Sequence, residues 1–142
     1  MVDKVWTEQD FAVMGWHDAR IYRISPPDEN CEMVFLIDYI FRWEEKRDAS
    51  GWYYWVSPCV LKFRDVFDLR IDLDFGNTTG LRILDIKHVG NTPWPSGKGE
   101  SLLLSIECDQ GAISFSCTGF EQTALEPAVR STTQDFGIWT GG

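Results

Sequence analysis

Apolar and polar residues alternate along most of the chain after Gly15, in short runs bounded by Gly, Pro, Asn, Asp or Ser. A period of two is typical of strands that bury one face. The pattern therefore predicts about eight strands. They cover residues 16–24, 31–43, 52–56, 59–66, 67–75, 81–89, 101–108 and 112–118.

One helical signal lies ahead of these strands. Thr7 and Asp10 have the spacing of a capping box, in which each side chain accepts a hydrogen bond from the other residue's backbone. Gly15 offers a stop, so the pattern predicts a short helix over 7–14. Residues 119–142 show no comparable pattern and are predicted to be irregular.

Length and composition indicate one folded domain. The chain has 142 residues, and 44% of them are hydrophobic, which supplies enough apolar area for a core. The predicted fold class is all-β: a single β domain over 1–142, arranged as an antiparallel sandwich or a small barrel of about eight strands with a short N-terminal helix.

The last two predicted strands form the clearest hairpin. A turn at Gln110 and Gly111 gives one apolar and one polar face, as expected for a half-buried pair. Cys108 and Cys117 do not face each other in this register, so we expect no disulfide between them. The predicted facing pairs are Leu104 with Cys117, Ile106 with Phe115, Cys108 with Ile113, Ser105 with Ser116 and Glu107 with Ser114.

The first two predicted strands bring a histidine to a carboxylate. Closing the loop 25–30 symmetrically places Tyr22 opposite Met33 and His17 opposite Asp38. The second strand is almost continuously apolar, which is typical of a central strand covered on both faces. Asp38 is therefore predicted to be buried, with His17 as the partner that this register offers.

This pair is the candidate catalytic group. His17 would act as a general base oriented by Asp38, as in a hydrolase. The segment around Ser57 and Cys59 has no motif that would bring a nucleophile to the pair. The alternative interpretation is a structural His–Asp pair that fixes the strand register.

The fifth and sixth predicted strands place two acidic residues face to face. Joining them across residues 76–80 sets Asp72 opposite Asp85, and like charges in that position repel. Either a β-bulge or solvent exposure relieves the repulsion, or the two carboxylates share a cation or a proton.

The charge balance narrows the choice of partners. A formal charge of -9 with no cluster of Lys and Arg argues against nucleic acid and anionic membranes as partners, and points to a basic protein. The first residues lack the pattern of a secretory signal, and no apolar run is long enough to span a membrane. We therefore expect a cytoplasmic protein.

Metal and cofactor chemistry has little support in the sequence. The four cysteines show no CxxC spacing, and the two histidines lie far apart in the chain. The segment 95–99 contains a GKG tripeptide without the rest of a phosphate-binding loop. The predicted cofactor content is none, and no metal site is predicted.

Tryptophan is abundant, with seven residues in the chain. Aromatic side chains dominate both cores and recognition surfaces. Trp94 stands between two prolines in a long loop, where its ring either pins the loop to the body or is presented to a partner.

Several motifs between residues 14 and 89 occur together. In these motifs the chain resembles a group of uncharacterised small bacterial proteins that share a Trp-His-Asp opening and a Leu-Asp-Ile-Asp-Tyr-like strand. The first Asp of that strand is absent from this sequence. A looser similarity links it to suspected immunity proteins of bacterial toxin systems. The resemblance implies no catalytic residue. The matching residues are Trp16-His17-Asp18, Ile21, Ile24, Leu36-Ile37-Asp38-Tyr39-Ile40, Trp43, Trp55-Val56-Ser57-Pro58, Phe63, Val66 and Asp68-Leu69.

These observations predict a non-catalytic cytoplasmic binding or interaction module, similar to an immunity protein. Asp72, Asp85 and Trp94 are the predicted binding residues, because acidic groups steer a cationic partner and an exposed ring can anchor it. The alternative function is a hydrolase that uses His17 and Asp38.

Overall fold

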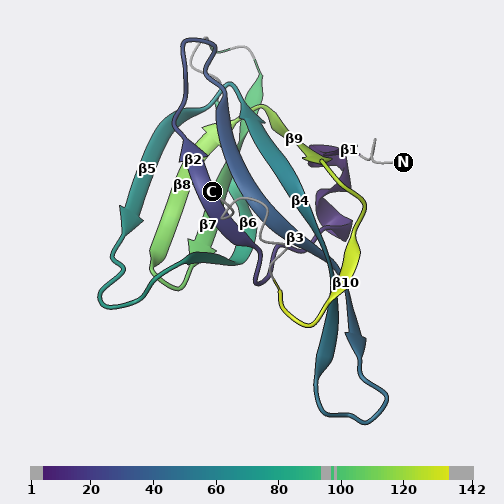
Figure 1. Ribbon diagram of the computed structural model, residues 1–142. Helices are drawn as coiled ribbons and strands as arrows, with labels where there is room; N and C mark the ends of the chain where they lie inside the picture. Colours follow the sequence, from purple (N-terminus) through teal and green to yellow (C-terminus); the bar gives the residue numbers. More distant parts are fainter. Residues whose placement is uncertain (1–4, 94–96, 98, 135–142) are drawn as a thin grey trace.

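The computed structural model describes residues 5–93, 97 and 99–134. In this part of the chain, ten strands and one short 3-10 helix, η1, form an all-β structure, as predicted (Figure 1). Their bounds are β1 Val5–Thr7, η1 Glu8–Val13, β2 Arg20–Ser25, β3 Met33–Glu45, β4 Trp52–Arg64, β5 Phe67–Leu73, β6 Leu81–Pro93, β7 Glu100–Cys108, β8 Gly111–Cys117, β9 Gly119–Ala124 and β10 Val129–Ser131.

The strands form one open antiparallel sheet in the order β1-β9-β4-β3-β2-β6-β7-β8-β5, and β10 also pairs with β4. Strands β2 and β6 meet through two residue pairs, Arg20 with Arg82 and Ile21 with Leu81. The sheet folds back at this seam, so that Phe63 of β4 contacts Phe115 of β8, with ring centres 4.7 Å apart. The two halves thereby enclose the core.

Large apolar side chains from both halves fill this core. Phe35, Phe63, Phe115 and Phe120 are all essentially fully buried. Trp16 joins them, and its indole donates a 2.8 Å hydrogen bond to the buried amide oxygen of Gln122. Burial of apolar side chains such as these rings is the dominant favourable contribution to folding.

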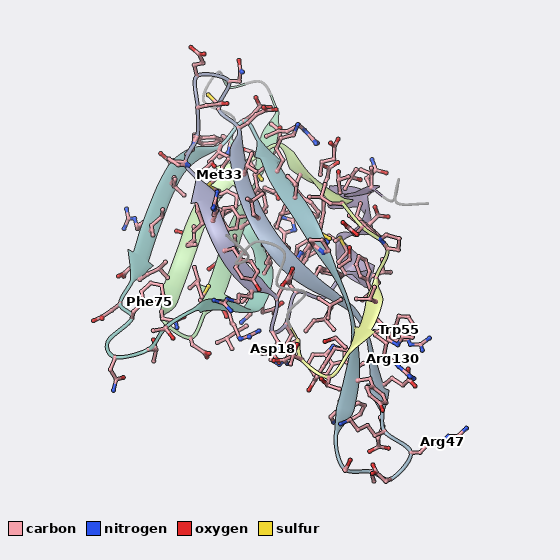
Figure 2. The ribbon with its side chains drawn as sticks, viewed as in Figure 1. Asp18, Met33, Arg47, Trp55, Phe75 and Arg130 are labelled. Carbon is pink, nitrogen blue, oxygen red and sulfur yellow. The ribbon has the colours of Figure 1, made fainter. Side chains whose placement is uncertain are left out.

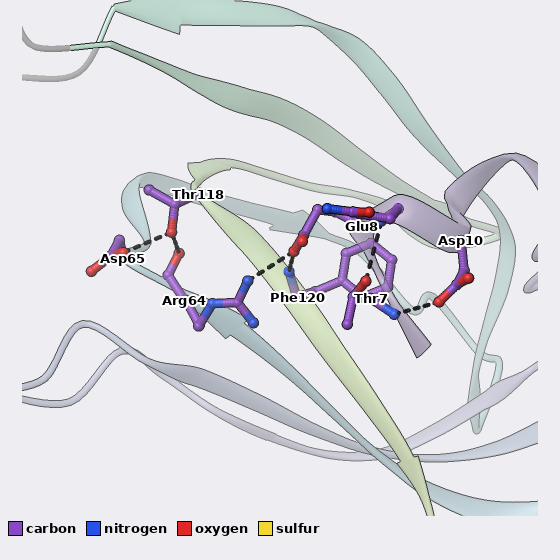
Figure 3. A network of polar contacts seen from close by, with 8 residues as sticks. Thr7, Glu8, Asp10, Arg64, Asp65, Thr118 and Phe120 are labelled. Atoms are coloured by element: carbon purple, nitrogen blue, oxygen red, sulfur yellow. Dashed lines mark hydrogen bonds and ion pairs between the residues drawn. The ribbon is translucent and has the colours of Figure 1, made fainter. Parts of the chain in front are cut away.

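The N-terminal helix forms as predicted, with its capping box. The Thr7 backbone donates to Asp10 Oδ2 at 2.9 Å, and the Thr7 hydroxyl accepts from Gln9. Glu8 then fixes η1 to the sheet, because its Oε1 accepts from Arg64 Nη2 at 2.8 Å and from the Phe120 backbone at 3.0 Å (Figure 3).

Strand β4 runs through a proline that we expected to separate two strands. Pro58 lies opposite Asp38 of β3, and its carbonyl accepts from the Leu125 backbone on the other side. On that side β9 pairs from Cys59 onward and β10 pairs up to Val56. Proline is tolerated here because it falls where one neighbouring strand ends and the other begins.

The prediction of an irregular segment over 119–142 is wrong for its first part, which contains β9 and β10. In β9, Phe120, Gln122 and Ala124 point inward and are buried. The glutamine breaks the apolar alternation in the sequence, yet its bond to Trp16 makes it a core residue.

The predicted register of β7 and β8 is wrong by two positions. Leu104 faces Phe115 and Ile106 faces Ile113, because the turn is the tighter pair Asp109 and Gln110. Gly111 follows it at φ 143°, a conformation that favours glycine. A shift of two preserves the faces. Cys108 and Cys117 are not partners, as predicted, and all four thiols are free, with Cys31 exposed and the other three buried.

The predicted pairing of β5 with β6 is also wrong. Strands β7 and β8 lie between them. The loop after β5 crosses the end of this hairpin, where Gln110 accepts from the Asp74 backbone and donates to the Gly80 carbonyl at 3.0 Å. Asp72 therefore faces Ala112, and Asp85 faces Glu107, so the two aspartates share no facing position.

Candidate functional site

The predicted pairing of His17 with Asp38 is wrong, because Arg20 is the residue that faces Asp38. The loop before β3 does not close symmetrically. Asp28 binds the backbone of Asn30 and Glu32 through its carboxylate, so that the paired part of β3 begins later than predicted. The loop moves the register by four positions, and a bulge in β2 between Ile21 and Arg23 takes one of them back.

Asp38 itself is fully buried, as predicted. The Tyr22 hydroxyl donates a 2.8 Å hydrogen bond to its Oδ2. Arg20, opposite Asp38, stacks on the Tyr22 ring at 4.6 Å. These contacts join the neighbouring strands β2 and β3 and give the buried carboxylate of Asp38 a hydrogen-bond partner, which is a structural role.

His17 lies on the surface. Its Nδ1 is 3.1 Å from the Leu84 carbonyl oxygen, and its Nε2 is 3.5 Å from Asp18 Oδ2. The ring stacks on Trp43, with ring centres 6.2 Å apart. Burial raises the pKa of the Cys59 thiol to about 12, so this thiol is not a thiolate nucleophile at neutral pH.

The predicted binding residues Asp72 and Asp85 lie on one face of the sheet. Facing pairs run from Asp72 through Ala112 and Glu107 to Asp85, across β5, β8, β7 and β6. Both aspartates are exposed. Trp94, the third predicted binding residue, lies outside the described residues.

The ends of β3 and β4 project from the sheet as a two-stranded hairpin, shown at the lower right of Figure 1. We call residues 42–55 the arm. Figure 2 places Arg47 at its tip and Trp55 beside Arg130 at its base. An isolated two-stranded hairpin is marginal in water, so the arm needs side-chain contacts to keep its shape.

One face of the arm supplies such contacts, and we call it the arginine face. Glu44 Oε1 accepts from the Trp55 indole at 3.0 Å and from Arg42 Nη2 at 3.2 Å, while Glu44 Oε2 is 3.5 Å from Arg130 Nη1. The indole bond, followed by the Arg42 bond, holds the pKa of Glu44 below its usual value. Cations also lie over the rings of this face: Arg42 over Trp55 at 5.0 Å, Arg130 over Tyr53 at 4.4 Å and Lys46 over Tyr53 at 5.2 Å.

The opposite face, which we call the tryptophan face, consists of Trp43, Glu45, Trp52 and Tyr54. Trp43 faces Tyr54, and Glu45 faces Trp52. The two tryptophans are 38% and 45% exposed. Exposed indoles on a projecting hairpin are typical of protein recognition surfaces.

A surface pocket of about 520 Å³ is lined by residues of the arm and by Arg130. Its lining carries three acidic and three basic side chains, so it favours neither an anion nor a cation by charge. The lining residues are Glu44, Glu45, Lys46, Arg47, Asp48, Tyr53 and Arg130.

Other kinds of site find no support in the described residues. Within 5–93, 97 and 99–134, no three His, Cys, Asp or Glu side chains form a group that could hold a metal ion. The same part of the chain contains no helix long and apolar enough to cross a membrane.

Comparisons with known proteins returned no matching family model, no matching curated protein and no matching solved structure. The candidate site therefore depends on the geometry of this chain. The sequence analysis missed the arm, although a signal was present: residues 42–55 combine three tryptophans with alternating charges.

Proposed function

We propose that the protein is a non-catalytic interaction module that recognises another protein through the arm. The observation that carries this proposal is the fixed, projecting hairpin with Trp43 and Trp52 exposed on one face. A hairpin already ordered before binding loses little conformational entropy in the complex, and indoles are frequent binding hot spots.

A basic protein fits the charge of the molecule. The formal charge of -9 attracts a cationic partner over a distance of about one Debye length and raises its association rate. The row of Asp72, Glu107 and Asp85 adds to this field from the sheet. The looser similarity to immunity proteins is consistent with such a partner.

A reducing cytoplasm is the compartment that we propose. Four free thiols in one small protein support it, because disulfides form readily in oxidising compartments. The hydrolase alternative loses its main support, since Asp38 does not orient His17 and the Cys59 thiol stays protonated.

The test begins with cross-linking of the whole protein in its native lysate, followed by binding measurements with the purified candidate. We expect Trp43→Ala and Trp52→Ala each to weaken the complex at least about tenfold, as at a binding hot spot. We also expect weaker binding at 300 mM than at 50 mM salt. A complex unaffected by both substitutions would refute the proposal.

A further inference from the structure

Both faces of the arm place a carboxylate beside an indole. They differ in whether basic side chains of the protein contact these groups. On the arginine face, Arg42 lies over the Trp55 ring and Arg130 is paired with Glu44. We propose that the tryptophan face binds arginine side chains of a partner protein. This inference rests on the proposed function and names the chemistry that the arm recognises.

The arginine face shows how the arrangement holds a guanidinium. Arg42 lies 5.0 Å from the Trp55 ring centre and at the same time donates to Glu44 at 3.2 Å. A planar guanidinium can stack on an aromatic ring while its edge donates hydrogen bonds, which a lysine ammonium cannot do.

The tryptophan face repeats these groups on neighbouring strands. Glu45 and Trp52 are directly opposite, which places their Cβ atoms about 4.5–5.5 Å apart. Trp43 is on the same face, two residues nearer the sheet, and its ring already contacts His17 and Tyr54. The position open to an arginine of a partner is therefore the one between Glu45 and Trp52.

His17 stacks on Trp43 at the sheet end of this face, but no lysine or arginine of the described residues has a contact with Glu45 or Trp52. Within the described residues, Glu45 makes no ion pair and Trp52 makes no ring or cation contact. The arm's basic side chains Arg42 and Lys46, together with Arg130, lie over rings of the arginine face. The tryptophan face thus offers aromatic rings and a negative charge, which complement an arginine-rich segment.

The test uses acetylated, amidated hexa-arginine as the probe, with hexa-lysine and hexa-glutamine for comparison, and measures binding by calorimetry. We expect hexa-arginine to bind most tightly. Glu45→Gln and Trp52→Ala should each weaken its binding roughly three- to fivefold.

Asp72→Asn is the matched control, because it removes the same unit of charge from β5, on the far side of the molecule from the arm (Figure 1). Screening limits its effect to less than about twofold. Equal weakening by Glu45→Gln and Asp72→Asn would overturn the inference in favour of general attraction. Equal binding of hexa-lysine, insensitive to Trp52→Ala, would overturn it too.

A second copy of the chain is the competing occupant, through its tip residue Arg47. Sedimentation that shows a dimer lost on Glu45→Gln and on Arg47→Ala would overturn the inference. The proposed function is tested separately. If the purified partner binds equally well to the protein with either tryptophan substitution, the arm is not its binding site, regardless of the result with the peptide.

Discussion

The body of the sheet and the arm are built from the same two strands, β3 and β4, yet different forces hold them. In the body, Phe35 and Phe63 are buried against the other half of the sheet. In the arm, Glu44 accepts hydrogen bonds from the Trp55 indole and from Arg42 and pairs with Arg130 at the surface. The arm can therefore lose its order without the body unfolding, and the predictions below test this separation.

The largest effect is expected in the body. Phe63→Ala removes a ring that contacts Phe35, Phe115 and Phe120, and a cavity of that size costs about 3–5 kcal/mol of unfolding free energy. Chemical denaturation measures it. Val13→Ala, at a position 84% exposed, is the control and should change little. A similar loss for both variants would contradict the assigned core.

A smaller loss is expected where η1 joins the sheet. A Cβ added at Gly119 would collide with the Glu8 carboxylate and the Arg64 guanidinium. Gly119→Ala should break the bonds of Glu8 to Arg64 and Phe120, at a cost of about 1–2 kcal/mol. Gly90→Ala is the control, because no atom lies within 4 Å of its added Cβ. Thermal unfolding of both variants measures the two losses of stability. Equal losses would contradict the role given to the Glu8 contacts.

A local effect is expected in the arm. Glu44→Gln removes the charge that holds Arg42 and Arg130, so amide exchange of residues in the arm should become faster. Exchange in the body should not change. Glu45→Gln removes the same charge from the tryptophan face and should leave arm exchange as it is. Acceleration throughout the protein would show that arm and body unfold as one unit.

The mildest perturbation is a change of pH. The folded protein holds the pKa of Glu44 below its usual value, so the contacts of this carboxylate persist from neutral pH through the usual titration range of glutamate and are lost only as the pH falls through the lowered pKa. The Trp55 indole N–H resonance should shift in that acidic range. The Trp16 indole N–H, bound to the amide of Gln122, should not follow the same titration. A shared transition would indicate global unfolding instead.

Local features of the fold could be predicted from the sequence, because alternation and capping act over a few residues. The capping box at Thr7 and the strand around Asp38 are examples. The order of the strands could not be predicted. It depends on long-range contacts such as those of Gln110, which lets the loop after β5 cross the β7–β8 hairpin.

Register was the weak point, and the candidate site depended on it. The asymmetric loop around Asp28 moved Asp38 away from His17, and the bulge in β2 reversed only one position of that shift. The buried Gln122 and the strand position of Pro58 also break the rules of composition that apply to most residues of their types. The arm escaped notice because abundant tryptophans are typical of cores as well as of recognition surfaces, and composition alone does not separate the two.

The tip of the arm also makes the chain divisible. Arg47 lies at the tip, beyond the end of β3, so a trypsin cut there would leave β1, β2 and β3 on one fragment and all later strands on the other. The fragments would remain interlocked, since β3 pairs with β4 and β1 pairs with β9. Cleavage at the tip is thus expected to leave the two fragments bound to each other, which size-exclusion chromatography of the cut protein would test.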